Sequence, residues 1–193
     1  MGGLVTFTRH AVTRSSYEVF RKRGDWGTTG AVDRLGRKGF LTTWVDTGVQ
    51  RLVLVNTHLL ANYDEDWSPG NRYAVQQEDE LRQLGDALEG LGDDVSLVVA
   101  GDFNIPAAHP MLDRFRQRTG LRNAQTEPSP TYRSPDPSQP GQQIDHILYR
   151  FGAGADATVT TRLRFEAEVP LADGRLHYPS DHFGVEADFE IAR

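Results

Sequence analysis

The chain has 193 residues, 38% of them hydrophobic, and a formal net charge of −6. This length and composition suit one hydrophobic core, so we expect a single domain over residues 1–193, and the acidic balance disfavours a protein that binds nucleic acid mainly through a basic surface. The absence of cysteine excludes disulfides, thiolate metal sites and cysteine nucleophiles, and no apolar run approaches the ~18 residues that span a bilayer.

Short apolar runs that are rich in β-branched residues predict buried strands in four places along the chain. They are Leu4–Phe7, Phe40–Val45, Leu52–Val55 and Leu97–Ala100. Near the C-terminus, apolar and acidic residues alternate over Phe165–Val169 and again over Val185–Ile191. This alternation predicts two further strands that each have one face in solvent.

Two helices are predicted from spacing and capping signals. Apolar residues recur at three-and-four spacing between residues 74 and 88, after SPGN and before Gly90, which indicates an amphipathic helix with its charged side chains in solvent. The polar residues at its start predict a capped, solvated face rather than substrate contacts; they are Asn71, Arg72, Gln76 and Gln77. A shorter helix should begin at Pro110 and end at Gly120.

The stretch from residue 127 to residue 143 is dense in Pro, Ser and Gln, so it predicts a long surface loop. The chain shows no internal repeat and no linker between domains. Because strands and helices are interleaved along the chain, the predicted fold class is α/β or α+β.

Polar groups that can carry chemistry lie beside apolar strands in four motifs. VNTHL contains His58, AGDFN contains Asp102 and Asn104, QIDHILY contains Asp145 and His146, and YPSDHFGV contains Asp181 and His182. A single Asp or Asn in such a place often only caps a turn, and a single His is often a half-buried structural residue. Four such motifs favour a shared site, because strand ends along one sheet edge can converge on one pocket.

The residue types in these motifs indicate phosphoryl chemistry. Carboxylate and amide oxygens without sulfur suit a hard cation, Mg²⁺ or Mn²⁺. A neutral His can take a proton from attacking water, an Asp can orient that His, and a second His can neutralise charge on the phosphate. On this interpretation Asp102 and Asn104 end a strand so that a rigid backbone aims them at metal and phosphate.

The motifs GGLVTFTRH, GRKGF, VNTHL, GDFN, PTY, IDHILY and SDHFGV resemble those of the endonuclease/exonuclease/phosphatase superfamily, in the family's order and over essentially the whole chain. This family includes DNase I-like nucleases, neutral sphingomyelinases and inositol polyphosphate 5-phosphatases. The resemblance implies a four-layer α/β/β/α sandwich of two mixed sheets, with the active site at one end of the sheets. It also implies a Mg²⁺-dependent phosphodiesterase.

The resemblance assigns a role to each matched residue. His182 would be the general base and Asp145 its orienting partner. Asp181 would be a carboxylate of the metal site. Asp102 would position the metal or the nucleophilic water, and Asn104 would hold the nucleophile, the metal or the phosphate.

Three other residues complete this set of expectations. His58 would stabilise the charged phosphate. Lys38 in GRKGF either reaches a phosphate or is a surface lysine before a turn glycine. His146 directly follows Asp145, so it should lie on the opposite face of its strand as a core residue or a support of the site.

Two elements of the family pattern have no counterpart in this sequence. They are a first strand that carries an Asn and a Gln-Glu motif whose Glu binds the catalytic metal. Glu18 is the first Glu of the chain, and SSYEVF does not match that motif. We therefore expect an incomplete domain, without the N-terminal strands of the family, that binds Mg²⁺ weakly and has low activity as it stands.

Within the family, the segment NTHLLANYDEDWSPGNRYAVQQEDEL resembles the sphingomyelinase-type branch. We expect hydrolysis of a phospholipid headgroup, with transient contact with a membrane surface and no obligate protein partner. A DNase I-like nuclease acting on nucleic acid is the alternative, and a basic groove with aromatic side chains for stacking would indicate it. An inactive fragment or interaction module is the third possibility. No signal-peptide pattern is visible at the start, so we expect a soluble, cytoplasmic protein.

Overall fold

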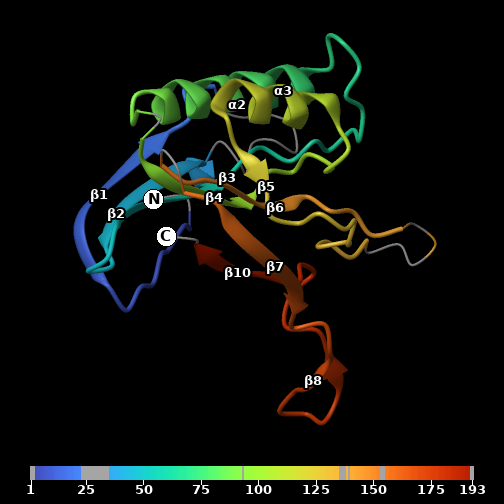
Figure 1. The fold of residues 1–193 in the computed structure, drawn as a ribbon. Helices are drawn as coiled ribbons and strands as arrows, with labels where there is room; N and C mark the ends of the chain where they lie inside the picture. Colours follow the sequence, from blue (N-terminus) through green and yellow to red (C-terminus); the bar gives the residue numbers. More distant parts are fainter. Residues whose placement is uncertain are drawn as a thin grey trace.

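The computed structural model describes residues 3–22, 35–92, 94–134, 138, 140–152 and 155–191. In these residues two helices lie on one face of a six-stranded mixed sheet, and a smaller two-stranded sheet lies on its other face (Figure 1). This arrangement confirms the predicted α/β sandwich class. Three of the four expected layers are present, because none of the described residues forms a helix on the outer face of the smaller sheet.

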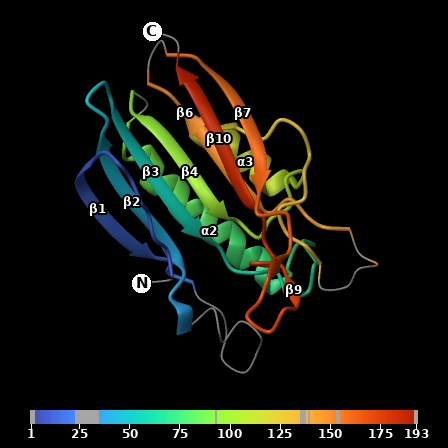
Figure 2. The same ribbon diagram turned by 90° about the horizontal axis from the view of Figure 1, so that it is seen from below.

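The larger sheet has the strand order β1-β2-β3-β4-β6-β5. Its strands are β1 (Ala11–Val19), β2 (Gly39–Asp46), β3 (Arg51–His58), β4 (Ser96–Asp102), β5 (Arg122–Asn123) and β6 (Asp145–Arg150). Strands β3 and β4 run parallel, and the other neighbouring pairs are antiparallel. The smaller sheet pairs β7 (Ala157–Arg164) with β10 (Gly184–Ile191), and between them in sequence β8 (Val169–Pro170) pairs with β9 (Leu176–His177) (Figure 2).

Helices α2 (Arg72–Glu89) and α3 (Pro110–Thr119) begin and end where the sequence predicts. The Asn71 side chain caps α2 by accepting hydrogen bonds from two backbone N–H groups of its first turn, and Gly120 ends α3 in the left-handed conformation with φ of 66°. The apolar sides of both helices pack on the larger sheet and form the main core; its members include Leu81, Leu84, Leu88, Leu112, Phe115, Val55, Leu97, Val99 and Leu148. Neither described helix is long and apolar enough to cross a membrane.

Two of the predicted strands are wrong. Leu4–Phe7 is not a strand; Val5 and Phe7 are exposed, and the first strand is β1, which pairs with β2 at the sheet edge. Phe165–Val169 is not one strand either, because β7 ends at Arg164 and Phe165 has a φ of 62° that turns the chain. An edge strand needs only backbone pairing with one neighbour, so β1 carries no apolar pattern that the sequence could have revealed.

The close approach of β3 and β4 at one end of the sheet depends on Gly101. This residue has a φ of 146°, and a Cβ atom there would lie 1.9 Å from the carbonyl oxygen of Thr57 on β3. Only glycine leaves room for that contact. The next pair in the ladder is His58 opposite Asp102, so Gly101 fixes the backbone directly beside two of the predicted site residues.

We expect Gly101→Ala to lower the free energy of unfolding by about 3 kcal/mol or more, because the added methyl group overlaps the backbone of Thr57 and opens the β3–β4 ladder. Urea unfolding followed by circular dichroism measures this change. Gly36→Ala is the matched control, since a Cβ there meets nothing within 4 Å, and it should change stability by less than about 0.5 kcal/mol. Equal stability of the two variants would contradict this account of the ladder.

Candidate active site

Three strand ends place polar side chains side by side at one edge of the larger sheet. Strands β3 and β4 are parallel and both finish here, while the antiparallel β6 begins here. His58 therefore lies opposite Asp102, and Asp102 lies opposite Asp145. Because side chains alternate between the faces of a strand, these three residues share the face that points away from the helices.

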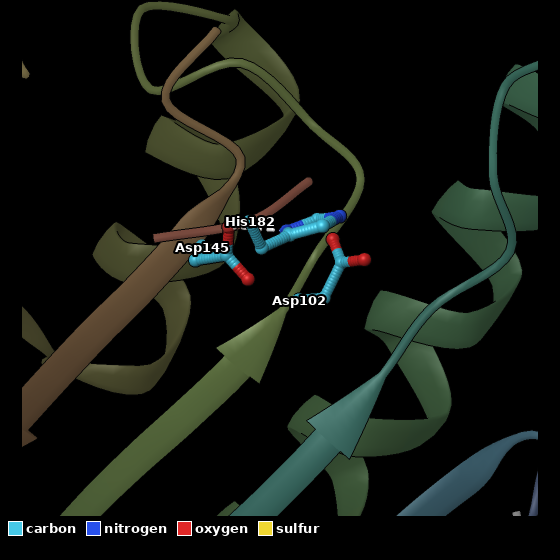
Figure 3. A group of neighbouring side chains, drawn as sticks. All are labelled: Asp102, Asp145 and His182. Atoms are coloured by element: carbon cyan, nitrogen blue, oxygen red, sulfur yellow. Dashed lines mark hydrogen bonds and ion pairs between the residues drawn. The ribbon is translucent and has the colours of Figure 1, made fainter. Parts of the chain in front are cut away.

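His182 joins this row from the segment just before β10. Its Nδ1 lies 2.8 Å from Oδ2 of Asp145, and its ring lies between the carboxyl groups of Asp145 and Asp102 (Figure 3). One nitrogen of His182 and one oxygen from each of the two carboxyl groups all lie within 4.8 Å of one another. Tyr132 supports this placement through a backbone bridge to His182 and a ring-to-ring distance of 5.1 Å.

Proximity changes the protonation of these groups. Burial, and then the nearby charge of Asp145, raise the pKa of Asp102 to about 6. The hydrogen bond to Asp145 raises the pKa of His182 above its ordinary value. His58 lies on the other side of Asp102, with its Nε2 at 3.4 Å from the Asp102 carboxylate. The site therefore holds two carboxyl groups that repel each other when both are ionised, with two imidazoles beside them.

This group fits a divalent cation. Burial and the repulsion from Asp145 both disfavour the ionised form of Asp102, and a positive ion would offset both effects. Asp102 and Asp145 offer the carboxylate oxygens that Mg²⁺ or Mn²⁺ prefers. Asp181, which we expected among the metal carboxylates, is exposed and does not belong to the group of three. Its charge is nonetheless near enough to contribute to the raised pKa of His182.

Hydrogen bonds to the carbonyl oxygen of Leu59, which follows β3, connect this segment to Asn104 in the segment after β4. Asn104 donates to this oxygen through Nδ2 at 3.0 Å, and Lys38 donates through Nζ at 2.8 Å. The backbone N–H of Asn104 also donates to Oδ1 of Asp102 at 2.8 Å, in a left-handed turn with φ of 51°. Both Asn104 and Lys38 therefore lie at the predicted site, and the charge of Lys38 acts to lower the pKa of Asp102.

Sequence reasoning missed a positioning role for Gln77. This residue is fully buried, and its Nε2 donates to the carbonyl oxygens of Leu60 at 2.8 Å and of Asn104 at 2.9 Å. Its Oε1 accepts a hydrogen bond from the indole N–H of Trp67 at 2.9 Å. One amide of α2 thus holds the segments after both β3 and β4, so the prediction of a solvated face is wrong at this position.

Glu80, one turn further along α2, is also buried, and it accepts a hydrogen bond from the backbone N–H of Leu60 at 2.8 Å. The prediction that the charged side chains of this helix lie in solvent is therefore wrong at Glu80. A signal was available for Gln77, because it falls on the same three-and-four spacing as the apolar residues of the helix. A polar residue on such a stripe requires hydrogen-bond partners in the core.

His146 lies outside the site. It is 1% exposed, its Nε2 is 2.9 Å from the carbonyl oxygen of Ile105, and its ring packs edge-on against Phe103 at 5.4 Å. Burial lowers its pKa below the ordinary value of a histidine. This placement on the helix-facing side of β6 agrees with the alternation expected from its position after Asp145.

Comparisons with known proteins give one family match and many structural ones. The sequence pattern of the "Endonuclease/Exonuclease/phosphatase family" matches residues 1–182. Sphingomyelinase C from Streptomyces griseocarneus is similar in structure, with a TM-score of 0.64 and 20% identity over 93% of this chain and 65% of its own. A beta toxin from Staphylococcus aureus with bound magnesium ions has a TM-score of 0.68 and 14% identity over 93% of this chain and 65% of its own.

A truncated TDP2 from Caenorhabditis elegans is also similar in structure, with a TM-score of 0.64 and 15% identity over 93% of this chain and 66% of its own. The chain thus spans slightly less than two thirds of the length of each of these three structures. At these identities the likeness concerns the fold. Among curated proteins, no sequence matches the chain significantly.

We expect Asp102→Asn to raise the free energy of unfolding by roughly 1 to 3 kcal/mol at pH 8. The pKa of Asp102 is raised from 3.8 to about 6 on folding, so the folded protein binds this proton more tightly than the unfolded chain. The stabilisation that protonation provides is fully present below pH 3.8 and is lost as the pH rises through about 6. At pH 8 the ionised carboxyl group is therefore a cost that the neutral amide removes.

Urea unfolding in EDTA at pH 8 and at pH 3.5 measures this difference. The gain from Asp102→Asn should largely disappear at the lower pH, where the carboxyl group is mostly neutral in both states. Asp181→Asn is the control, because that side chain is exposed, and it should change stability little at either pH. A loss of stability in Asp102→Asn at pH 8 would show that the raised pKa has been wrongly assigned.

Gln77→Leu should lower the free energy of unfolding by roughly 2 to 4 kcal/mol, because it leaves polar groups of buried Leu60 and of part-buried Asn104 and Trp67 without their partner. Amide hydrogen exchange should also speed up in the segments after β3 and β4. Gln76→Leu is the matched control, since Gln76 is only half-buried and its amide reaches a single side chain, Glu80. Equal effects of the two substitutions would refute the positioning role of Gln77.

Proposed function

Because this chain belongs to the endonuclease/exonuclease/phosphatase family, we propose that it acts as a metal-dependent phosphoesterase that hydrolyses a phosphodiester with water activated by His182. The observation that carries the proposal is the pairing of His182 with Asp145, whose Nδ1 and Oδ2 atoms lie 2.8 Å apart. Asp102 lies beside this pair, where β4 ends and β6 begins. A base, its orienting carboxylate and a second carboxylate for a cation are the groups that this reaction needs.

The His182–Asp145 pair suits general-base catalysis. When Asp145 accepts a hydrogen bond from Nδ1–H, the imidazole is fixed in the tautomer whose Nε2 carries a lone pair. That nitrogen can take a proton from the attacking water, and Asp145 then stabilises the imidazolium that forms. The raised pKa of His182 reflects this same stabilisation of the charged ring.

The remaining residues suit the binding of the phosphate. A divalent cation held by Asp102 and Asp145 would polarise a phosphoryl oxygen. His58 supplies positive charge beside Asp102 when it is protonated. An amide nitrogen carries two N–H groups, so Asn104 can hold a phosphate oxygen while it keeps its hydrogen bond to Leu59. Lys38 lies beside this group and adds its charge.

For the substrate we propose a phospholipid headgroup, reached by transient contact with a membrane surface. The pocket beside His182 is lined by Tyr63, Trp67 and Tyr132, and its lining includes no Lys or Arg within the described ranges of the chain. A nucleic acid substrate would require cationic side chains along its path to balance its phosphates. The similarity to a sphingomyelinase C supports the same choice, and a DNase I-like nuclease remains the alternative that the test must separate.

His182→Ala should reduce Mg²⁺-dependent hydrolysis of bis(p-nitrophenyl) phosphate by roughly 10²- to 10⁴-fold, because the water loses its base. Its stability should change little. His146→Ala is the control; it should lower stability through loss of the buried contact with Ile105, and it should keep its activity per folded molecule. Undiminished hydrolysis by the His182→Ala protein would show that His182 is not the general base.

A panel of sphingomyelin, plasmid DNA and inositol phosphates, each with Mg²⁺ and with EDTA, tests the substrate class. We expect hydrolysis of sphingomyelin that requires Mg²⁺. Faster hydrolysis of plasmid DNA would establish the nuclease alternative instead. If the chain hydrolyses neither these substrates nor the generic phosphodiester, the proposed activity is wrong for this chain.

A further inference from the structure

A pocket of about 330 Å³ opens directly beside the candidate active site. His182 and Asn104 form part of its wall, so a phosphate bound at these residues would border the pocket. The volume falls within the range of small-molecule sites. We call this space the aromatic pocket and define it by Tyr63, Glu65, Trp67, Asn104, Tyr132 and His182.

Three aromatic rings line the aromatic pocket, and contacts hold each of them. Trp67 donates its indole N–H to buried Gln77 at 2.9 Å. Tyr132 packs against the ring of His182 at 5.1 Å, and Tyr63 meets Tyr73 edge-on at 5.5 Å. The faces of aromatic rings carry negative charge density that attracts cations. These contacts therefore present a preformed surface that suits a positively charged group.

The charged residues of the pocket lining also favour a positively charged group. Glu65 lies in the pocket wall, at the centre of the sequence Asp64-Glu65-Asp66. Burial, followed by the charges of Asp181 and Glu65, raises the pKa of Tyr132, which shows that these carboxylates act on the pocket wall. No lysine or arginine lines the pocket in the parts of the chain that the structure describes.

The loop that carries Glu65 is ordered by its own hydrogen bonds. Asn62 is buried; its Nδ2 donates to the carbonyl oxygen of Asp66 at 2.8 Å, and its own carbonyl oxygen accepts from the N–H of Glu65 at 3.1 Å. The carboxylate of Asp64 accepts from Nδ2 of Asn71, the residue that caps α2, at 3.0 Å. Glu65 is thus held at the pocket by a loop that is anchored to the helix beneath it.

We propose that the aromatic pocket binds an ammonium group of the substrate, which lies on the faces of Tyr63, Trp67 and Tyr132 and near the carboxylate of Glu65. The inference rests on the proposed function, since it takes the phosphate to lie at His182 and Asn104. It narrows the substrate class to a phosphodiester with a cationic headgroup. Nucleic acids and inositol polyphosphates would instead bring further negative charge to an anionic wall.

Binding of a matched ligand pair tests this proposal. Phosphocholine and its isostere 3,3-dimethylbutyl phosphate, which keeps the phosphate but has a neutral tert-butyl group in place of the trimethylammonium group, are titrated separately into the protein in Mg²⁺. Heat or chemical-shift changes report the affinity. We expect phosphocholine to bind at least about fivefold more tightly, because a cation on aromatic faces gains roughly 1 kcal/mol or more. Glu65→Gln and Tyr63→Leu should each reduce this ratio to about twofold or less. Glu190→Gln, an exposed glutamate on β10, should leave the ratio unchanged.

Equal affinity for the two ligands would overturn the proposal, and so would a ratio that neither Glu65→Gln nor Tyr63→Leu reduces. Failure of both ligands to bind would also overturn it. Hydrolysis of bis(p-nitrophenyl) phosphate, which has no cation, is measured on the same preparations to separate the two proposals. If the protein hydrolyses this ester but does not prefer phosphocholine, only the ammonium pocket is refuted. If it prefers phosphocholine but does not hydrolyse the ester, only the proposed activity is refuted.

Discussion

The parallel pairing of β3 with β4 is the constraint on which the rest of the structure depends. Parallel strands finish at the same sheet edge, so His58 and Asp102 arrive there together, and the antiparallel β6 brings Asp145 to the same edge at its first residue. Without this combination of directions, the three side chains would lie at opposite ends of the sheet. The ladder closes fully at this edge only because Gly101 has no side chain to meet the backbone of β3.

Features that cost stability are concentrated at this edge. Asp102 is an ionisable group whose charge is opposed by burial and by Asp145, Asn104 has a left-handed backbone conformation, and Gln77 is a fully buried amide. Hydrogen bonds hold two of these residues in place: Asn104 donates its backbone N–H to Asp102, and Gln77 donates to the carbonyl oxygen of Asn104. Such a concentration is typical of functional sites, where geometry is maintained against local preference.

The electrostatics of the site change sign over a short distance. Lys38, and His58 when it is protonated, supply positive charge at one side of the carboxylate group, where we propose that a phosphate binds. The aromatic pocket on the other side of His182 has Glu65 and aromatic faces in its wall. A zwitterionic substrate would match both parts at once, whereas a polyanion would match only the first. This complementarity is linked to the fold through Gln77, which joins the segment after β3, where the aromatic pocket has Glu65, to the segment after β4, where Asn104 lies.

The sequence by itself determined the strands at the centre of the sheet, both helices with their caps, the alternating strand at the C-terminus and the chemical character of the four site motifs. These features depend on local pattern: the period of apolar residues, a capping Asn71 and a terminal Gly120. Only the tertiary structure decided that β1 and β7 are strands, that Asp181 lies outside the group of three, and that Gln77 positions the site. It alone also revealed the aromatic pocket. Each of these depends on contacts between segments far apart in the chain, and a local pattern carries no information about which distant segment will supply the partner.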